Sequence, residues 1–177
     1  MAMQGSARTA GAAMRGKRGA GRSLRLDDQL CFTLYTASRL VTAFYRPLLD
    51  ELGLTYPQYL VLLVLWERGP CQLKDVAAAL DLDYGTLSPL LKRLEAAGLV
   101  RRERRSDDER AVSLTLSPAG ESLRASCASL PAQVAQAMGL SPKGLTQLKT
   151  AVQGLAASIA ATSRGRGKTP ARSLNDR

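Results

Sequence analysis

The segment from residue 74 to residue 116 constrains the fold most, because the spacing of its apolar residues changes within a short distance. Two helical patterns are separated by a tight polar turn, and the second pattern stops at Gly98. Two β-like runs joined by a polar link follow immediately. The expected elements are helices over 74–80 and 84–97, and strands over 99–105 and 111–116 with the link at 106–110. This order of elements predicts a winged helix-turn-helix.

Helical patterns on both sides of this segment predict a mainly α fold with a small β-hairpin wing. A long apolar stripe at steps of three and four begins near Asp27, the expected N-cap, and ends at Gly53. Thr55 and Gln58 have the spacing of a capping box, followed by an almost wholly apolar helix. The other expected elements are helices over 58–68, 118–138 and 142–160 and a short extended piece over 71–73. The stripe is long enough to need a partner surface, in this chain or in a second subunit.

The net charge of +10 belongs to the ends of the chain. Residues 1–25 have six basic side chains and no acid, and residues 164–177 have five basic and one acidic side chain. The stretch between them has fourteen of each sign and is neutral. The ends are rich in Gly, Ala, Ser and Arg, so we expect disordered basic tails over 1–25 and 161–177. Nucleic-acid binding therefore has to be argued from where the central charges lie.

Several classes of function are excluded by the residues that the chain lacks. It has no histidine, which excludes Ser-His-Asp and Cys-His catalysis and histidine-ligated zinc. Its cysteines, Cys31, Cys71 and Cys127, form no Cys-x-x-Cys pair, so we expect no metal, no cofactor and free thiols. No apolar run approaches the ~20 residues of a membrane span, and no apolar stretch follows the basic N-terminus. We expect a cytoplasmic protein that is not an enzyme.

The second helix of the central segment has one apolar and one polar side. At ~100° per residue, leucines 87, 90, 91 and 94 share one side. The other side has Thr86 and Ser88 near its start and Lys92 and Arg93 further along, which suits entry into the major groove of DNA. The hairpin adds arginines at 101, 102, 104, 105 and 110. Each feature alone is compatible with ordinary solvated surface, but their order together predicts DNA binding.

Three motifs in this region resemble the MarR family of winged-helix regulators. They are residues 94–100 (LEAAGLV), residues 108–110 (DER) and residues 114–120 (LTLSPAG). The resemblance covers about residues 26–160. It implies that Arg110 enters the minor groove and that Asp108 orients it. It also implies a domain over 26–160, with a DNA-binding lobe over about 55–117 and dimerisation helices over about 27–53 and 118–160.

Within that family, the chain is similar to the repressors that respond to organic hydroperoxides. The similarity is carried by residues 29–35 (QLCFTLY), by residues 54–59 (LTYPQY) and by residues 82–87 (LDYGTL). It implies that organic peroxide oxidises Cys31 to a sulfenic acid and that Tyr45 and Tyr56 hydrogen-bond the reduced thiolate. It further implies that Cys127 is the resolving cysteine in an intersubunit disulfide. The subgroup has Ser where this chain has Tyr84, so the operator contact expected there differs.

The spacing of Cys31 and Tyr45 on one helix is compatible with such a sensor in a dimer. Fourteen residues separate them, which is ~21 Å along a straight helix and ~40° around it. They cannot touch within one chain, but they can meet where this helix packs against its copy about a two-fold axis. A cysteine at an apolar helix start is also a common small core residue, so this alternative stays open. We expect Cys71 to be structural.

These observations predict a homodimeric repressor that binds an inverted-repeat operator in double-stranded DNA and is released by organic hydroperoxide. Two alternatives remain. One is a MarR-type regulator that is released by a small phenolic ligand, with Cys31 passive. The other is a cysteine peroxidase, for which the sequence offers no catalytic surroundings.

Overall fold

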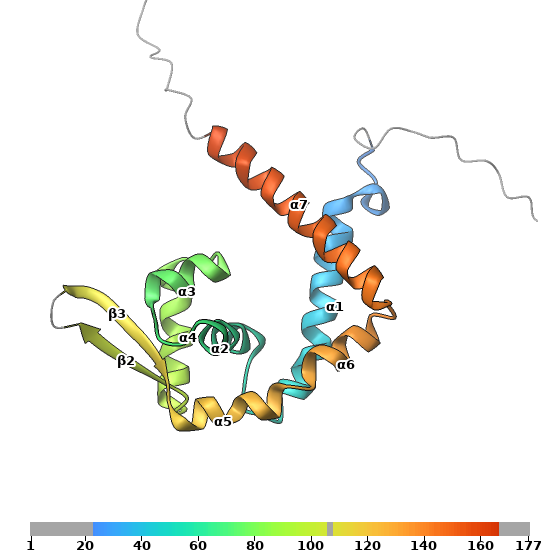
Figure 1. Cartoon of the computed structure of the whole chain (residues 1–177). Helices are drawn as coiled ribbons and strands as arrows, with labels where there is room; N and C mark the ends of the chain where they lie inside the picture. Colours follow the sequence, from blue (N-terminus) through green and yellow to red (C-terminus); the bar gives the residue numbers. More distant parts are fainter. Residues whose placement is uncertain (1–22, 106–107, 167–177) are drawn as a thin grey trace, which may run out of the picture. The chain divides into compact units, whose positions relative to one another are not determined.

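A computed structural model of the chain describes residues 23–105 and 108–166. The chain divides into two compact units, one ending at Leu40 and one beginning at Val41. The elements (Figure 1) are a 3₁₀ turn Leu26–Asp28, α1 Leu30–Asp50, α2 Tyr56–Arg68, β1 Cys71–Gln72, α3 Leu73–Leu80, α4 Tyr84–Ala96, β2 Val100–Arg105, β3 Asp108–Leu116, α5 Pro118–Cys127, α6 Leu130–Ala137 and α7 Pro142–Arg166.

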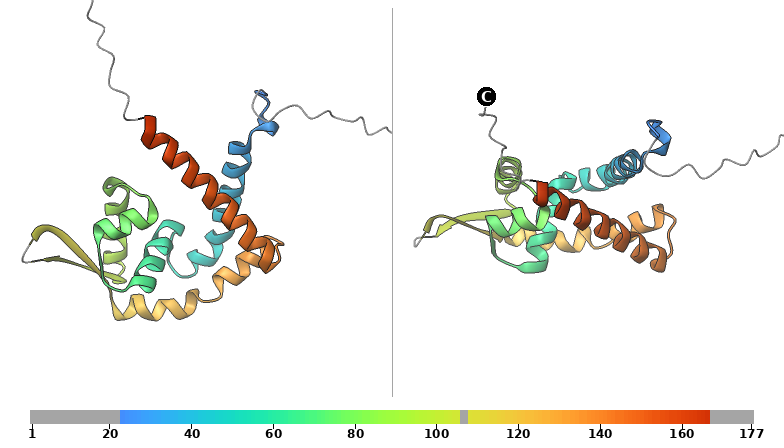
Figure 2. Two further views of the ribbon diagram at one scale, coloured as in Figure 1. Left: turned by 45° about the horizontal axis from the view of Figure 1, so that its top comes forward. Right: turned by 90° about the horizontal axis from the view of Figure 1, so that it is seen from above.

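The strands form a three-stranded antiparallel sheet in the order β1-β3-β2, which confirms the expected small β wing in a mainly helical chain. β1 pairs with the base of β3, where Cys71 lies opposite Leu114. β2 and β3 continue together past the helices, and both views of Figure 2 show this ribbon reaching away from α3 and α4. The sheet therefore joins the lobe at one end and projects from it at the other.

The core of the lobe lies between α2, α4 and the sheet. Val61 and Leu62 of α2, Leu87 and Leu91 of α4, and Leu114 of β3 are all completely buried. Full burial of one such side chain contributes about 1.5–3 kcal/mol to folding. This packing fixes which side of α4 faces inward, and it leaves the opposite side to solvent.

The start of α1 differs from the expectation. Asp27 lies within the 3₁₀ turn and is not an N-cap, because α1 begins only at Leu30. The turn is held by hydrogen bonds from the Ser23 hydroxyl to the Asp28 carboxylate (2.6 Å) and from the Gln29 amide to the Ser23 carbonyl (2.5 Å). These local side-chain bonds compete with helix formation.

The next two helix boundaries follow the sequence signals. Gly53 has a φ of 66° just after α1, and the Leu54 N–H donates to the Leu49 carbonyl (2.9 Å), so Gly53 is confirmed as the stop. The capping box is also confirmed, since the Thr55 N–H donates to Gln58 Oε1 (2.8 Å). α2 begins at Tyr56, two residues earlier than expected.

The region after the wing was predicted wrongly as one helix to about Met138. α5 ends at Cys127 and α6 begins at Leu130, with Pro131 in its first turn. Proline has no N–H and its ring clashes with the carbonyl four residues earlier, so one helix cannot continue through it without a break. α7 runs on to Arg166, six residues beyond its expected end. The rest of the predicted tails, 1–22 and 167–177, lies outside the described residues.

The predicted link in the hairpin was too long. β3 already begins at Asp108, so residues 108–110 belong to the strand. Arg105 lies opposite Asp108, and the register shifts between Arg104 and Arg105. A β-bulge or similar irregularity places extra residues on one strand, and the two strands can then stay paired closer to the tip of the hairpin.

Among the helices that the structure describes, none combines the length and the apolar character needed to cross a membrane. The same part of the chain contains no group of three or more metal-ligating side chains.

Gly120 occupies a position with no room for a side chain. A Cβ added there would overlap the Leu99 carbonyl oxygen and would lie 3.2 Å from Leu116 Cδ2. The Gly120 carbonyl also accepts a buried hydrogen bond from Trp66 Nε1 (3.0 Å). The close approach of the Gly120 and Leu99 backbones therefore joins α5 to the base of the wing, and the hydrogen bond from the Trp66 side chain joins it to α2.

Gly120→Ala is expected to lower the free energy of unfolding by about 1–3 kcal/mol, because the backbone must shift to admit the methyl group. Urea denaturation at one fixed protein concentration measures this. Gly154→Ala is the matched control: it lies in α7 with nothing within 4 Å of the added Cβ, so it should gain about 0.5–1 kcal/mol. If Gly120→Ala and the wild type unfold with equal free energy, the conclusion that Gly120 has no room for a side chain is wrong.

Candidate nucleic-acid interface and cysteine site

The N-terminus of α4 is held by one carboxylate. Asp83 is the N-cap, and its Oδ1 accepts from the Thr86 N–H (2.8 Å) while its Oδ2 accepts from the Thr86 hydroxyl (2.8 Å). The backbone bond from Thr86 lowers the pKa of Asp83 most, and the side-chain bond lowers it further. At the start of α4, the ionised Asp83 carboxylate therefore holds both the N–H and the hydroxyl of Thr86 in fixed positions.

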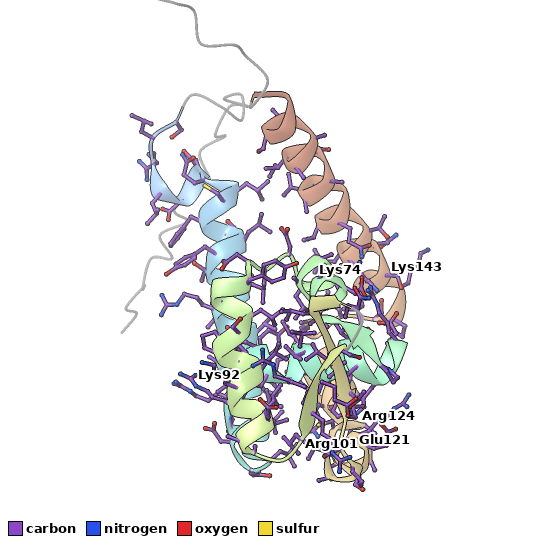
Figure 3. All side chains as sticks on the ribbon, turned by 90° about the vertical axis from the view of Figure 1, so that its left-hand side faces the viewer. Lys74, Lys92, Arg101, Glu121, Arg124 and Lys143 are labelled. Carbon is purple, nitrogen blue, oxygen red and sulfur yellow. The ribbon has the colours of Figure 1, made fainter. Side chains whose placement is uncertain are left out.

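The predicted DNA-contacting side of α4 faces solvent, as the predicted buried side faces the core. Tyr84 is 56% exposed, and Thr86, Lys92 and Arg93 are also exposed. Ser88 is only half-buried, so less of it is available than of its neighbours. Figure 3 labels Lys92 on α4 and Arg101 at the base of the hairpin. The exposed α4 side chains that the sequence predicts to contact DNA therefore lie on the side of this helix that faces away from the core.

The wing arginines do not all face solvent. Arg101 is exposed, but Arg102 is half-buried with its guanidinium Nη1 3.9 Å from Glu95 Oε2 of α4. Among the described residues, the Arg102 Nε is buried without a hydrogen-bond partner. Arg102 therefore faces α4 and is not part of an outward cationic cluster. The side chains of Asp108 and Arg110 lie outside the described residues, although their backbone belongs to β3.

Strand alternation was the sequence signal that could have found the orientation of Arg102. Successive side chains of a strand point to opposite faces, so Arg102 shares a face with buried Val100. It also lies opposite buried Leu114 in the sheet register. A count of basic residues that ignores this alternation therefore overestimates the positive charge that the hairpin exposes to solvent.

The two tyrosines predicted to serve the thiol lie together. The rings of Tyr45 and Tyr56 have centroids 4.9 Å apart, and both pack near Tyr59 at 5.8 and 6.5 Å. Burial raises the pKa of Tyr45 and of Tyr56, and it raises the pKa of Tyr59 to about 12. The phenols therefore keep their protons and can donate hydrogen bonds. Tyr59, which was not among the residues predicted for the site, completes this aromatic cluster.

The three cysteines differ in exposure. Cys31, in the first turn of α1, is exposed, whereas Cys71 is half-buried and Cys127, the last residue of α5, is only 3% exposed. Burial raises the pKa of the Cys127 thiol and, together with Asp75, that of Cys71. A buried, protonated thiol is a poor nucleophile, and Cys31 is the most accessible of the three thiols.

Comparison with known proteins identifies relatives among winged-helix transcription regulators. The model of the MarR family matches residues 54–112. An organic hydroperoxide resistance transcriptional regulator of Bacillus subtilis is 44% identical over 129 residues, which are 73% of this chain and 88% of the relative. The structure of reduced AbfR bound to DNA has a TM-score of 0.64 at 38% identity and covers 76% of this chain and 95% of AbfR. The disulfide form of AbfR, a protein of Staphylococcus epidermidis, has a TM-score of 0.53 at 40% identity, covering 74% and 92%.

The winged helix-turn-helix fold and the solvent-exposed side of α4 place the chain in the class of DNA-binding transcription regulators, which are not enzymes. The chain belongs to the MarR family. The family and the fold class expected from the sequence are thereby confirmed.

Proposed function

We propose that the protein is a redox-sensing repressor that binds operator DNA as a reduced homodimer and leaves it when an organic hydroperoxide oxidises Cys31. The observation that carries this proposal is that Cys31 is exposed, whereas the thiols of Cys71 and Cys127 are less accessible. The Bacillus relative is named for organic hydroperoxide resistance, and AbfR is known both reduced on DNA and as a disulfide. Operator DNA would place the protein in the cytoplasm.

On the DNA, the N-terminus of α4 enters the major groove of each half-site of an inverted repeat. Tyr84, Thr86 and Ser88 then reach base edges, while Lys92 and Arg93 meet phosphates. Arg110 of the wing enters the minor groove, where negative potential is concentrated, and Asp108 orients it. The exposure of most of these α4 side chains supports this arrangement.

The oxidation step consumes one peroxide. The Cys31 thiolate attacks one oxygen of the peroxide, an S–O bond forms, the O–O bond breaks, and the alkoxide leaves as an alcohol after taking up a proton. Cys31 becomes a sulfenic acid. We assign to Tyr45 and Tyr56 of a second copy the hydrogen bonds that stabilise the thiolate beforehand. Their raised pKa supports this role, because a protonated phenol is a donor.

The resolving step joins two subunits. The Cys127 thiolate attacks the Cys31 sulfur, an S–S bond forms and hydroxide leaves, to be protonated to water. Because Cys127 is buried, the end of α5 must move first. The break between α5 and α6 directly follows Cys127, so a movement there does not have to bend a continuous helix. Such a movement would change the spacing of the two α4 helices and release the operator.

The test is a gel-shift of the purified dimer on its own promoter fragment. Cumene hydroperoxide is expected to release the reduced protein, and dithiothreitol is expected to restore binding. A protein that ignores the peroxide but dissociates with a small phenolic acid such as salicylate would instead be the ligand-responsive regulator.

Cys127→Ser is expected to abolish the covalent dimer that peroxide produces in the wild type, because no second thiol can condense with the sulfenic acid. A non-reducing gel measures this, and all samples should run as monomers with dithiothreitol. Cys71→Ser is the matched control and should still form the covalent dimer. Crosslinking that persists in Cys127→Ser and disappears in Cys71→Ser would reject this pairing.

A further inference from the structure

The hydroxyl of Thr86 has a fixed direction. Its Oγ1 lies 2.8 Å from Asp83 Oδ2, and the same carboxylate accepts the Thr86 N–H at 2.8 Å. An ionised carboxylate has lone pairs but no hydrogen, so the hydroxyl must be the donor of this bond. The low pKa of Asp83 keeps the carboxylate ionised near neutral pH. The only hydrogen of the Thr86 hydroxyl is therefore directed at the Asp83 carboxylate.

What Thr86 presents to the outside is consequently an acceptor. The side chain is exposed in the first turn of α4, and exposed Arg93 lies two turns further along nearly the same side. In the major groove, adenine N6 and cytosine N4 are hydrogen-bond donors, whereas the polar groups of guanine (N7 and O6) and of thymine (O4) are all acceptors. An oxygen with no free hydrogen can pair with the first two bases but not with the others.

We propose that Asp83 determines the base preference of this regulator by holding Thr86 as an acceptor, so that one position in each half-site is read as adenine or cytosine. The assignment rests on the proposed DNA binding by α4. Asp83 acts through Thr86 and is a positioning residue, because each of its two oxygens accepts a hydrogen bond from Thr86, Oδ1 from the N–H and Oδ2 from the hydroxyl.

One substitution reverses the direction of this hydrogen bond. In Asp83→Asn, the carboxamide oxygen can still accept the Thr86 N–H, and asparagine is as good an N-cap as aspartate. The amide nitrogen, however, donates to Thr86 Oγ1, which frees the hydroxyl hydrogen to point outward. The residue that faces the DNA is unchanged, but it becomes a donor for guanine or thymine.

Loss of a negative charge near DNA also raises affinity for any sequence, so a matched control is needed. Asp81→Asn removes the same charge two residues earlier. Asp81 is exposed and has a φ of 52°, a left-handed conformation that asparagine also adopts readily. Base preference that changes in Asp83→Asn but not in Asp81→Asn is therefore not a general charge effect.

The experiment is selection of bound duplexes from a randomised pool, followed by sequencing, for the wild type and four variants of the full chain. The wild type and Thr86→Ser should enrich adenine or cytosine at one position per half-site, and Asp81→Asn should do the same. Thr86→Val, which keeps the shape and the methyl group, should lose only that preference and bind its former site roughly two- to tenfold more weakly per half-site. Asp83→Asn should enrich guanine or thymine there.

Two results overturn the assignment. One is a base preference that stays unchanged at every position in Thr86→Val. Valine keeps the methyl group of threonine, so a preference for thymine that arises from a methyl contact would also give this result. The other is identical base preference in Asp83→Asn and Asp81→Asn. If the wild type enriches no sequence at all, the proposed DNA-binding function fails and the assignment fails with it. Circular dichroism and the dimer mass of each variant show that the compared proteins are folded.

Discussion

Cys31→Ser is expected to bind operator DNA as tightly as the reduced wild type and to remain bound at hydroperoxide concentrations that fully release the wild type. The hydroxyl of serine cannot follow the thiolate route to a sulfenic acid, so both later steps are lost. The substitution exchanges only sulfur for oxygen at a position that is exposed in the single chain, so we expect the fold and the dimer to be unaffected. Fluorescence anisotropy of a labelled operator, titrated with cumene hydroperoxide, measures the response.

Cys71→Ser provides the comparison, because it makes the same chemical change at a half-buried thiol of the lobe and should respond to peroxide as the wild type does. A sulfenic-acid trap analysed by mass spectrometry should label Cys31 in the wild type. If Cys31→Ser leaves the operator at the wild-type peroxide concentration, Cys31 is not the sensor.

Arg110→Ala is expected to weaken operator binding roughly tenfold or more per half-site, since one contact of this kind is worth ~1–3 kcal/mol. Both half-sites lose the contact, so the effect on the dimer is about the square of the effect on one. The physical reason is the loss of a cation from the narrow minor groove, where negative potential is concentrated. Anisotropy titrations at several salt concentrations measure the affinity, and a thermal melt shows that the dimer stays folded.

Arg124→Ala serves as the control for charge alone. Arg124 is an exposed cation on α5 that lies 3.8 Å from Glu121, and it is not part of the proposed interface. Its removal should change the affinity much less than removal of Arg110. Unchanged affinity of Arg110→Ala at low salt would take the wing arginine out of the interface.

The helices and their ends were predictable from the sequence wherever they depend on interactions between residues close together in the chain. Gly53 ends α1 through its own backbone conformation, and Gln58 closes the capping box with Thr55 three residues away. The leucine stripe of α4 predicted its buried side for the same reason, because helical spacing alone places those side chains together. The bond between Asp83 and Thr86 is equally local and was detectable as an N-cap spacing, although the sequence argument did not use it.

Misjudged boundaries arose where two local signals compete. Asp27 is a good N-cap by residue type, yet the bonds among Ser23, Asp28 and Gln29 favour a 3₁₀ turn and delay the helix. Pro131 is compatible with the first turn of a helix and incompatible with its interior, whereas the apolar pattern continues across it and favours one uninterrupted helix.

The sequence by itself therefore determined the order of elements as far as the wing and the inward side of α4, and it indicated Cys31, Tyr45 and Tyr56 as candidate sensor residues. Only the tertiary structure decided how exposed the chosen groups are and what they touch. Arg102 faces Glu95, Trp66 reaches the carbonyl of Gly120, and Cys127 is buried where Cys31 is not. The physical reason is that exposure, pKa and orientation depend on neighbours brought together by packing, and a side chain cannot show from its own position in the sequence which neighbours those will be.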